Sequence, residues 1–229
     1  MTKPLRAYTV TEEYENTGAV IFAVHNVVAR RLGANEYADG EFSAVSCRRA
    51  PWADAYAGKP IPARVMIAHG WHFECSECGA CIDEDWLCDN GLPLEGVIGT
   101  QHSHVFCGSR CARRYYSLRR RRKAEEQRAI EAFKAIVRRR FPDADFCDEA
   151  DGDRFRERHH AYVIPGRGGW HWKQVVIAFR FPGMKIGPAH FRMDGNYRMG
   201  PDFAGYTCCA GDKEAFEAYA KATRRAADG

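Results

Sequence analysis

Six of the ten cysteines in this 229-residue chain lie in a segment of 37 residues between Cys75 and Cys111. They are Cys75, Cys78, Cys81, Cys88, Cys107 and Cys111. A segment this short cannot bury enough apolar surface to form a core of its own, so it needs another source of stability. Clustered thiols supply that stability either as disulfides or as metal ligands. The choice between these two constrains the fold more than any other feature of the sequence.

The rest of the chain favours metal binding over disulfides. Residues 1–16 lack the apolar stretch of a signal peptide, because charge returns at Glu12 and Glu13. The longest near-apolar run, residues 19–24, is far shorter than a membrane span. We therefore expect a cytoplasmic protein that does not cross a membrane, in a compartment where thiols stay reduced.

Two cysteine pairs have the spacing of zinc ligands. Cys75 and Cys78 are separated by two residues and followed by Gly79, which can adopt the positive φ that a tight turn needs. The second pair is Cys107 and Cys111, and an N-cap at Ser109 would place Cys111 in a first helical turn, where free N–H groups stabilise thiolates. The pairs fit the two halves of a tetrahedral zinc site better than they fit disulfides or buried thiols.

The stretch "CSECG", followed after an insert by "VFCGSRC" and a basic helix, resembles the treble-clef zinc fingers of the TRASH, MYM and FCS type. The resemblance covers about 45 residues and implies one structural Zn²⁺, because four thiolates leave no open position for water. The implied ligands are Cys75, Cys78, Cys107 and Cys111. Four other residues stay open as alternative ligands: Cys81, Cys88, His102 and His104.

A second resemblance concerns the whole chain. The stretches "CRRAPWAD" and "HGWHFEC", together with the cysteine pairs, are similar to small uncharacterised proteins of tailed phages and prophages. This resemblance implies a phage source, and hence the host cytoplasm, but no particular activity. The remaining cysteines have no ligand partners in sequence and are expected to be core or surface thiols: Cys47, Cys147, Cys208 and Cys209.

A strongly basic stretch follows the last clustered cysteine. Residues 112–141 contain twelve basic and three acidic side chains, a net charge of +9, whereas the whole chain carries only +4. Apolar residues recur there at spacings of three or four before Pro142, which predicts a long amphipathic helix. The recurring residues are Ile130, Phe133, Val137 and Phe141. If the helix is unbroken from Ser109, it is about 45–50 Å long.

The arginines of this helix suit contact with phosphate, because a guanidinium forms two parallel hydrogen bonds with phosphate oxygens. Tyr115 and Tyr116 lie beside them, available to stack or pack. No base-reading pattern is visible, so such binding would be non-specific and sensitive to salt. The alternatives are an acidic partner protein, and a helix whose arginines are merely solvated or pair with acids of residues 143–153. The candidate contacts are Arg113, Arg114, Arg119, Arg120, Arg121 and Arg122.

Short strands and helices are expected elsewhere. Residues 5–10 and 19–24 have strand length, and residues 26–38 form a helix with Asn26 as N-cap and an apolar side at Val27, Val28 and Leu32. Gly33 weakens that helix, a third strand falls in residues 41–47, and a short helix lies in residues 62–70. Further strands are expected at 160–164, 172–181 and 188–193, and a last helix at 212–226 with Phe216 and Tyr219 inward.

We therefore predict an α+β fold in three parts. A small α/β unit occupies residues 1–70, and a treble-clef zinc module with the start of the basic helix occupies residues 71–123. A C-terminal α+β unit with a short antiparallel sheet and helices occupies residues 124–229.

No catalytic signature accompanies this fold. The chain lacks Gly-x-Ser-x-Gly, His-Glu-x-x-His and dinucleotide-binding fingerprints, and the acids at residues 83–85 are explained by a loop. We expect a non-enzymatic, zinc-stabilised protein that contacts nucleic acid through the arginine-rich helix. The alternatives are a phage accessory factor that binds a host protein, such as a defence or transcription component, and a metal-dependent hydrolase or nuclease.

Overall fold

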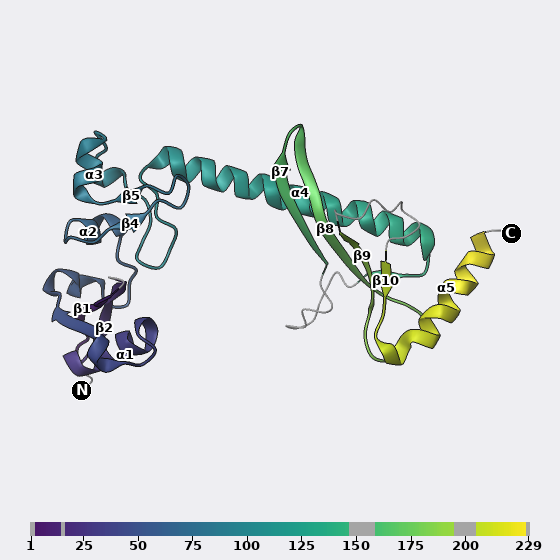
Figure 1. Cartoon of the computed structure of the whole chain (residues 1–229), viewed down its shortest axis with the longest axis horizontal. Helices are drawn as coiled ribbons and strands as arrows, with labels where there is room; N and C mark the ends of the chain where they lie inside the picture. Colours follow the sequence, from purple (N-terminus) through teal and green to yellow (C-terminus); the bar gives the residue numbers. More distant parts are fainter. Residues whose placement is uncertain (1–2, 15–16, 147–158, 195–204, 228–229) are drawn as a thin grey trace. The chain divides into compact units, whose positions relative to one another are not determined.

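The computed structural model describes residues 3–14, 17–146, 159–194 and 205–227 (Figure 1). The chain divides into two compact units, Met1–Tyr116 and Ser117–Gly229. Both units combine helices with antiparallel strands, which confirms the α+β class. The finer division at residues 70 and 123 stays a prediction. Within the described ranges, no helix has both the length and the apolar content needed to cross a membrane.

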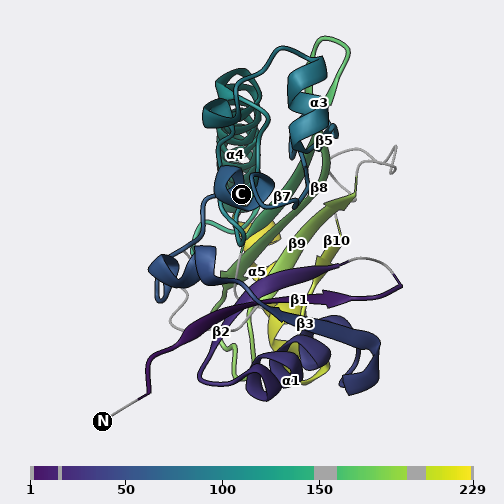
Figure 2. The ribbon, with the colours of Figure 1, turned by 90° about the vertical axis from the view of Figure 1, so that its left-hand side faces the viewer.

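The first unit begins with a three-stranded antiparallel sheet in the order β2-β1-β3 (Figure 2). Its strands are β1 (Arg6–Glu12), β2 (Gly18–Ala23) and β3 (Val45–Arg49). The first two follow the predicted apolar runs. The third is shorter than expected, because a turn of 3₁₀ helix at Phe42–Ala44 precedes it.

Helix α1, Asn26–Tyr37, packs against this sheet with a face that the sequence did not predict. The expected apolar side is exposed: Val27 66%, Val28 42% and Leu32 48%. The buried residues are the small ones, Ala29, Gly33 and Ala34. At Gly33 an added Cβ would lie 2.2 Å from Cγ1 of Val10, so only a face without large side chains can approach β1 this closely.

The start of α1 also differs from the prediction. His25 occupies the N-cap position and makes no side-chain capping bond. The Asn26 side chain instead donates to the carbonyl of Cys47 at 3.1 Å, which ties the helix to β3. Asn26 as N-cap was therefore wrong.

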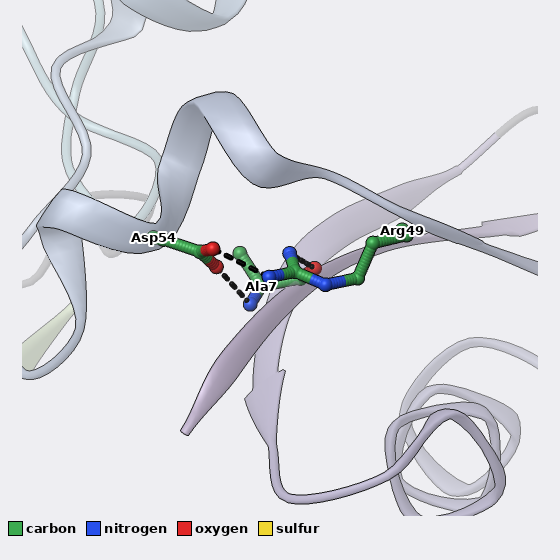
Figure 3. Close-up of polar contacts among 3 residues, drawn as sticks. All are labelled: Ala7, Arg49 and Asp54. Atoms are coloured by element: carbon green, nitrogen blue, oxygen red, sulfur yellow. Dashed lines mark hydrogen bonds and ion pairs between the residues drawn. The ribbon is translucent and has the colours of Figure 1, made fainter. Parts of the chain in front are cut away.

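The turn that follows β3 is fastened to β1 by an ion pair (Figure 3). Asp54, in the 3₁₀ helix Pro51–Tyr56, pairs with Arg49 and accepts a hydrogen bond from the Ala7 N–H at 2.9 Å. Arg49 also donates to the Ala7 carbonyl at 2.7 Å. The hydrogen bond from Arg49 holds the pKa of Asp54 below its usual range. These contacts give Arg49 and Asp54 of the "CRRAPWAD" stretch a structural role.

The stretches "CRRAPWAD" and "HGWHFEC" meet in the first unit. Trp52 of "CRRAPWAD" stacks on His69 of "HGWHFEC", with ring centroids 4.1 Å apart and planes 20° from parallel. His69 follows helix α2, Ala63–Ile67, which lies where Pro62 and Gly70 predicted a short helix. Trp52 and Trp71 pack around the same buried residues, which include Met66.

The second unit contains a five-stranded antiparallel sheet in the order β10-β9-β8-β6, with β7 also paired to β8. Strands β7 (His160–Gly166) and β8 (Gly169–Arg180) form the hairpin predicted around "PGRGG". The other strands are β6 (Asp145–Phe146), β9 (Ala189–Asp194) and β10 (Gly205–Thr207).

Helix α4 runs unbroken from Ser109 to Arg140, 32 residues or about 48 Å, which confirms the predicted long helix. Its C-terminal part packs on the sheet together with helix α5, Lys213–Ala227. The shared core includes Phe133, Val137 and Phe141 of α4, Val175, Ile177 and Phe179 of β8, and Phe216 and Tyr219 of α5. The apolar stripe begins at Ala129, which is fully buried, while Ile130 is only partly buried.

A buried carboxylate holds the connection between β8 and β9. Asp212, 1% exposed, accepts the backbone N–H groups of Lys185, Ile186 and Gly187 at 2.9, 2.8 and 3.1 Å. The Cys209 thiol also donates to it at 3.1 Å. Burial acts to raise the pKa of Asp212, but these donors outweigh it and lower the pKa to about 2.

Candidate metal centre

Four cysteines come together in the first unit. The sulfur atoms of Cys75, Cys78, Cys107 and Cys111 all lie within 4.8 Å of one another. The Cys107 sulfur is 3.9 Å from that of Cys78 and 3.5 Å from that of Cys111. Four sulfurs placed tetrahedrally about 2.3 Å from one ion would be about 3.8 Å apart. The cluster therefore has the dimensions of a tetrathiolate site and could hold a metal ion.

A hairpin of two short strands positions the first pair. Strands β4 (Phe73–Glu74) and β5 (Cys81–Ile82) are antiparallel, and the cysteine pair lies in the turn between them. Within the turn, the Cys75 N–H donates to the Ala80 carbonyl at 2.8 Å and the Gly79 N–H donates to the Cys75 carbonyl at 2.9 Å. Gly79 has a φ of +73°, which confirms the positive φ expected there.

The second pair spans the entry into α4. Phe106, fully buried, exchanges two backbone hydrogen bonds with Ile98, at 2.8 and 3.0 Å. Cys107 follows directly. Helix α4 begins at Ser109, which is its first helical residue and not the N-cap that the sequence predicted, and Cys111 lies in the first helical turn as predicted. Unpaired helix N–H groups and the helix dipole favour thiolates at this position.

Two contacts join the halves of the cluster. The Ser76 N–H donates to the carbonyl of Val105 at 2.9 Å. Glu77, whose side chain is only 12% exposed, forms an ion pair with Arg114 at 2.8 Å. Arg114, a candidate nucleic-acid contact in the sequence, therefore has an ion-pair partner in the turn between β4 and β5.

The electrostatics of the cluster match a site for a cation. Burial acts to raise the pKa of the Cys75 thiol, but backbone N–H groups of Cys78, Cys107 and Glu77 donate to its sulfur and bring the pKa down to about 7. Burial and the neighbouring thiols of Cys111 and Cys75 raise the pKa of Cys107. Several adjacent thiolates need a positive charge among them, and a divalent ion supplies it.

The four alternative ligands lie elsewhere. Cys81 is exposed and its thiol faces the Asp83 carboxylate at 3.9 Å; burial and this carboxylate raise the pKa of the thiol. The Nε2 atom of His104 is hydrogen-bonded to the Tyr115 hydroxyl at 2.9 Å. Cys88 is exposed on helix α3, and the His102 ring contacts the Gln101 amide at 3.2 Å. In the described part of the chain, the four-cysteine group alone has the geometry of a metal site.

The acids at residues 83–85 begin a helix. Asp83 is the N-cap of α3, Glu84–Asp89, and accepts the Trp86 N–H at 2.7 Å. Glu84 and Asp85 follow in the first turn, where negative charge is favourable. The loop expected here was therefore wrong, and a structural role accounts for these carboxylates.

The candidate arginines of α4 are all exposed, but their surroundings differ. Arg122 forms an ion pair with Glu126 at 3.2 Å, and Arg113 donates to the Ser109 carbonyl at 3.3 Å. Arg119, Arg120 and Arg121 form no ion pair with any described residue. Of the acidic stretch that could have paired with them, residues 147–153 lie outside the described ranges. The two tyrosines beside the arginines pack on Phe106, at ring distances of 5.2 and 5.6 Å.

Comparisons with protein-family models, curated proteins and solved structures found no match.

Proposed function

We propose that the chain binds one structural Zn²⁺ through the four clustered cysteines. Zinc accepts four thiolates in tetrahedral geometry and has no redox chemistry of its own, and a closed tetrathiolate site stabilises a fold instead of activating water. The close approach of the four sulfurs supports this assignment. The ion would fix the β4–β5 turn to the start of α4, in the manner of a treble-clef finger.

We further propose that the α4 helix anchored in this way binds nucleic acid non-enzymatically. The observation that carries the proposal is a run of exposed cations at residues 119–123, four arginines and one lysine. No acidic residue occurs between residues 109 and 124, and Arg119, Arg120 and Arg121 form no ion pair with any described residue, so the charge of these three is not offset. A surface of this kind attracts phosphates through release of their counterions.

A salt titration tests the proposal. Binding of labelled duplex and single-stranded oligonucleotides is measured across a range of salt concentrations, after zinc has been quantified by mass spectrometry. The test variant carries Arg119→Gln, Arg120→Gln and Arg121→Gln, which removes three charges and keeps residues of good helix propensity. We expect the duplex salt slope to fall by about 0.9 for each phosphate that the variant no longer neutralises.

The matched control removes three exposed arginines of the first unit, Arg31, Arg48 and Arg64, each replaced by Gln. It has the same net charge as the test variant, so a general charge effect would weaken both equally. An affinity that is flat with salt, or no binding at low salt, contradicts the proposal. Zinc without nucleic-acid binding would direct attention to an acidic protein partner.

A further inference from the structure

The β7–β8 hairpin of the second unit carries two large aromatic side chains that remain accessible. Tyr162 is 47% exposed and Trp172 is 39% exposed. The hairpin closes through a two-residue turn at Arg167 and Gly168, where Gly168 has a φ of +87°. In Figure 1 the β7–β8 hairpin crosses α4, and its turn extends past the helix at the top of the view.

A register shift lies beside the two rings. Tyr162 is paired with Gln174 and Val163 with Trp172, so Lys173 has no partner in the ladder. A bulge of this kind increases the local twist and changes the direction in which neighbouring side chains point. The irregularity therefore affects the part of the hairpin where the exposed aromatics lie.

Both rings contact α4. The guanidinium carbon of Arg122 lies 5.2 Å from the Tyr162 ring centroid, within the range of a cation–π interaction. The Trp172 ring meets Phe133 edge-on, with centroids 5.6 Å apart. These contacts, all within the second unit, place the aromatic part of the hairpin beside the helix that carries residues 119–123.

The charge of the hairpin matches that of the helix. Residues 160–176 contain no acidic side chain and include Arg167 and exposed Lys173. On α4, Arg122 lies against Tyr162, and Arg119 is on the same face of the helix one turn earlier, so cations and aromatic rings lie side by side. We call this combination, Tyr162 and Trp172 with Arg119 and Arg122, the stacking surface.

We propose that the stacking surface binds single-stranded nucleic acid, with phosphates on the α4 cations and bases stacked on Tyr162 and Trp172. The inference rests on the proposed function and specifies its substrate. In a duplex the base faces are covered by neighbouring base pairs, so exposed rings gain nothing from it. In a single strand every base presents a face that can stack on an aromatic side chain, whatever its sequence.

The test compares three labelled probes: a thymidine DNA oligonucleotide of about 16 nucleotides, a uridine RNA of the same length and a DNA duplex. Tyr162→Ala is the main variant, because the contact described for its ring is with an exposed arginine and not with the core. We expect it to weaken binding of the single strand about five- to a hundredfold, and to leave the duplex affinity unchanged. The two single-stranded probes show whether DNA or RNA is preferred.

Three further variants control the experiment. Tyr162→Phe keeps the ring and is expected to restore single-strand affinity to within about twofold of the original chain. Trp172→Phe keeps an aromatic group against Phe133, so the fold is retained, and it is expected to reduce the quenching of tryptophan fluorescence by bound bases. Tyr14→Ala removes a tyrosine that is 88% exposed in the first unit and is expected to change nothing.

The outcomes separate the two proposals. Unchanged single-strand affinity in Tyr162→Ala, or a wild-type chain that binds the duplex as tightly as the single strand, overturns the stacking surface. In that case a reduced salt slope in the triple arginine variant would leave the proposed function standing. No binding to any of the three probes overturns both.

Discussion

Cys107 is 8% exposed, and its sulfur lies between those of Cys78 and Cys111, at 3.9 and 3.5 Å. If the cluster binds zinc as we propose, Cys107→Ser should release the ion and unfold residues 73–111, because serine is a poor zinc ligand and the small core around the site would depend on the ion. Zinc content by mass spectrometry and thermal unfolding measure the two effects. Cys81→Ser, outside the cluster, should retain one zinc. Stoichiometric zinc in Cys107→Ser would disprove the ligand set.

From the low pKa of Asp212 we predict that the stability of the second unit falls in acid. The folded pKa of about 2 lies below the value of about 3.9 for an unfolded aspartate, so the stabilisation by this carboxylate is fully present above the unfolded value. That stabilisation is lost as the pH falls from about 4 through about 2. Asp212→Asn should lower the unfolding midpoint at neutral pH and flatten the acid profile. Circular dichroism during thermal unfolding at a series of pH values checks this.

The control for Asp212 is Glu217→Gln, which changes an exposed residue of α5 whose ion pair with Lys213 is 3.9 Å long. Exposed pairs of this kind contribute little to stability. A similar acid profile in Asp212→Asn and the original chain would show that the carboxylate does not anchor the β8–β9 connection.

At the scale of elements, the packing of α1 on β1 depends on the absence of a Cβ at Gly33. Gly33→Ala would gain about 1 kcal/mol of helix propensity, but its Cβ would overlap Val10. Overpacking of this kind costs about 1–3 kcal/mol, so we expect a net loss of stability, measured by denaturant unfolding. Arg31→Ala, an exposed change in the same helix, is the control. A more stable Gly33→Ala protein would show that α1 can move away from the sheet without cost.

Elements with a long regular pattern could be predicted from the sequence. Helix α4 and the β7–β8 hairpin have clear periodicity and clear stops at Pro142 and at the glycines of the turn. Helix α3 is only six residues long, too short for its periodicity to be informative. The buried face of α1 was predicted wrongly because its close approach to the sheet favours small residues over apolar ones.

The candidate site was predictable because its cysteines form pairs that lie close together in the sequence. Two ligand pairs with characteristic gaps identified four cysteines that the structure brings together. Contacts between distant residues had no such signal. The pairing of Glu77 with Arg114 and the approach of Tyr162 to Arg122 depend on the tertiary fold, and neither pair has a spacing in the sequence that would indicate it.

At the scale of the whole molecule, the two units have separate cores. The cysteine cluster shares a core with residues such as Ile82 and Leu87 of the first unit, whereas the core of α4, β8 and α5 lies in the second. If zinc is bound as we propose, removing it with a chelator should therefore expose backbone amides of residues 73–111 and leave those of residues 175–181 protected. Hydrogen exchange followed by mass spectrometry measures this. Loss of protection in both regions would mean that the units unfold together.

All four clustered cysteines lie within 37 consecutive residues, and the second unit supplies none of them. Ribosomes add about 5–20 residues per second, so the segment from the first ligand to the last is made in about 2–7 s. Capture of the proposed ion could thus be complete before the five-stranded sheet has been synthesised. If the cluster binds zinc as we propose, the zinc supply of the cell would govern how much of this protein folds during translation, independently of the rate at which the second unit folds.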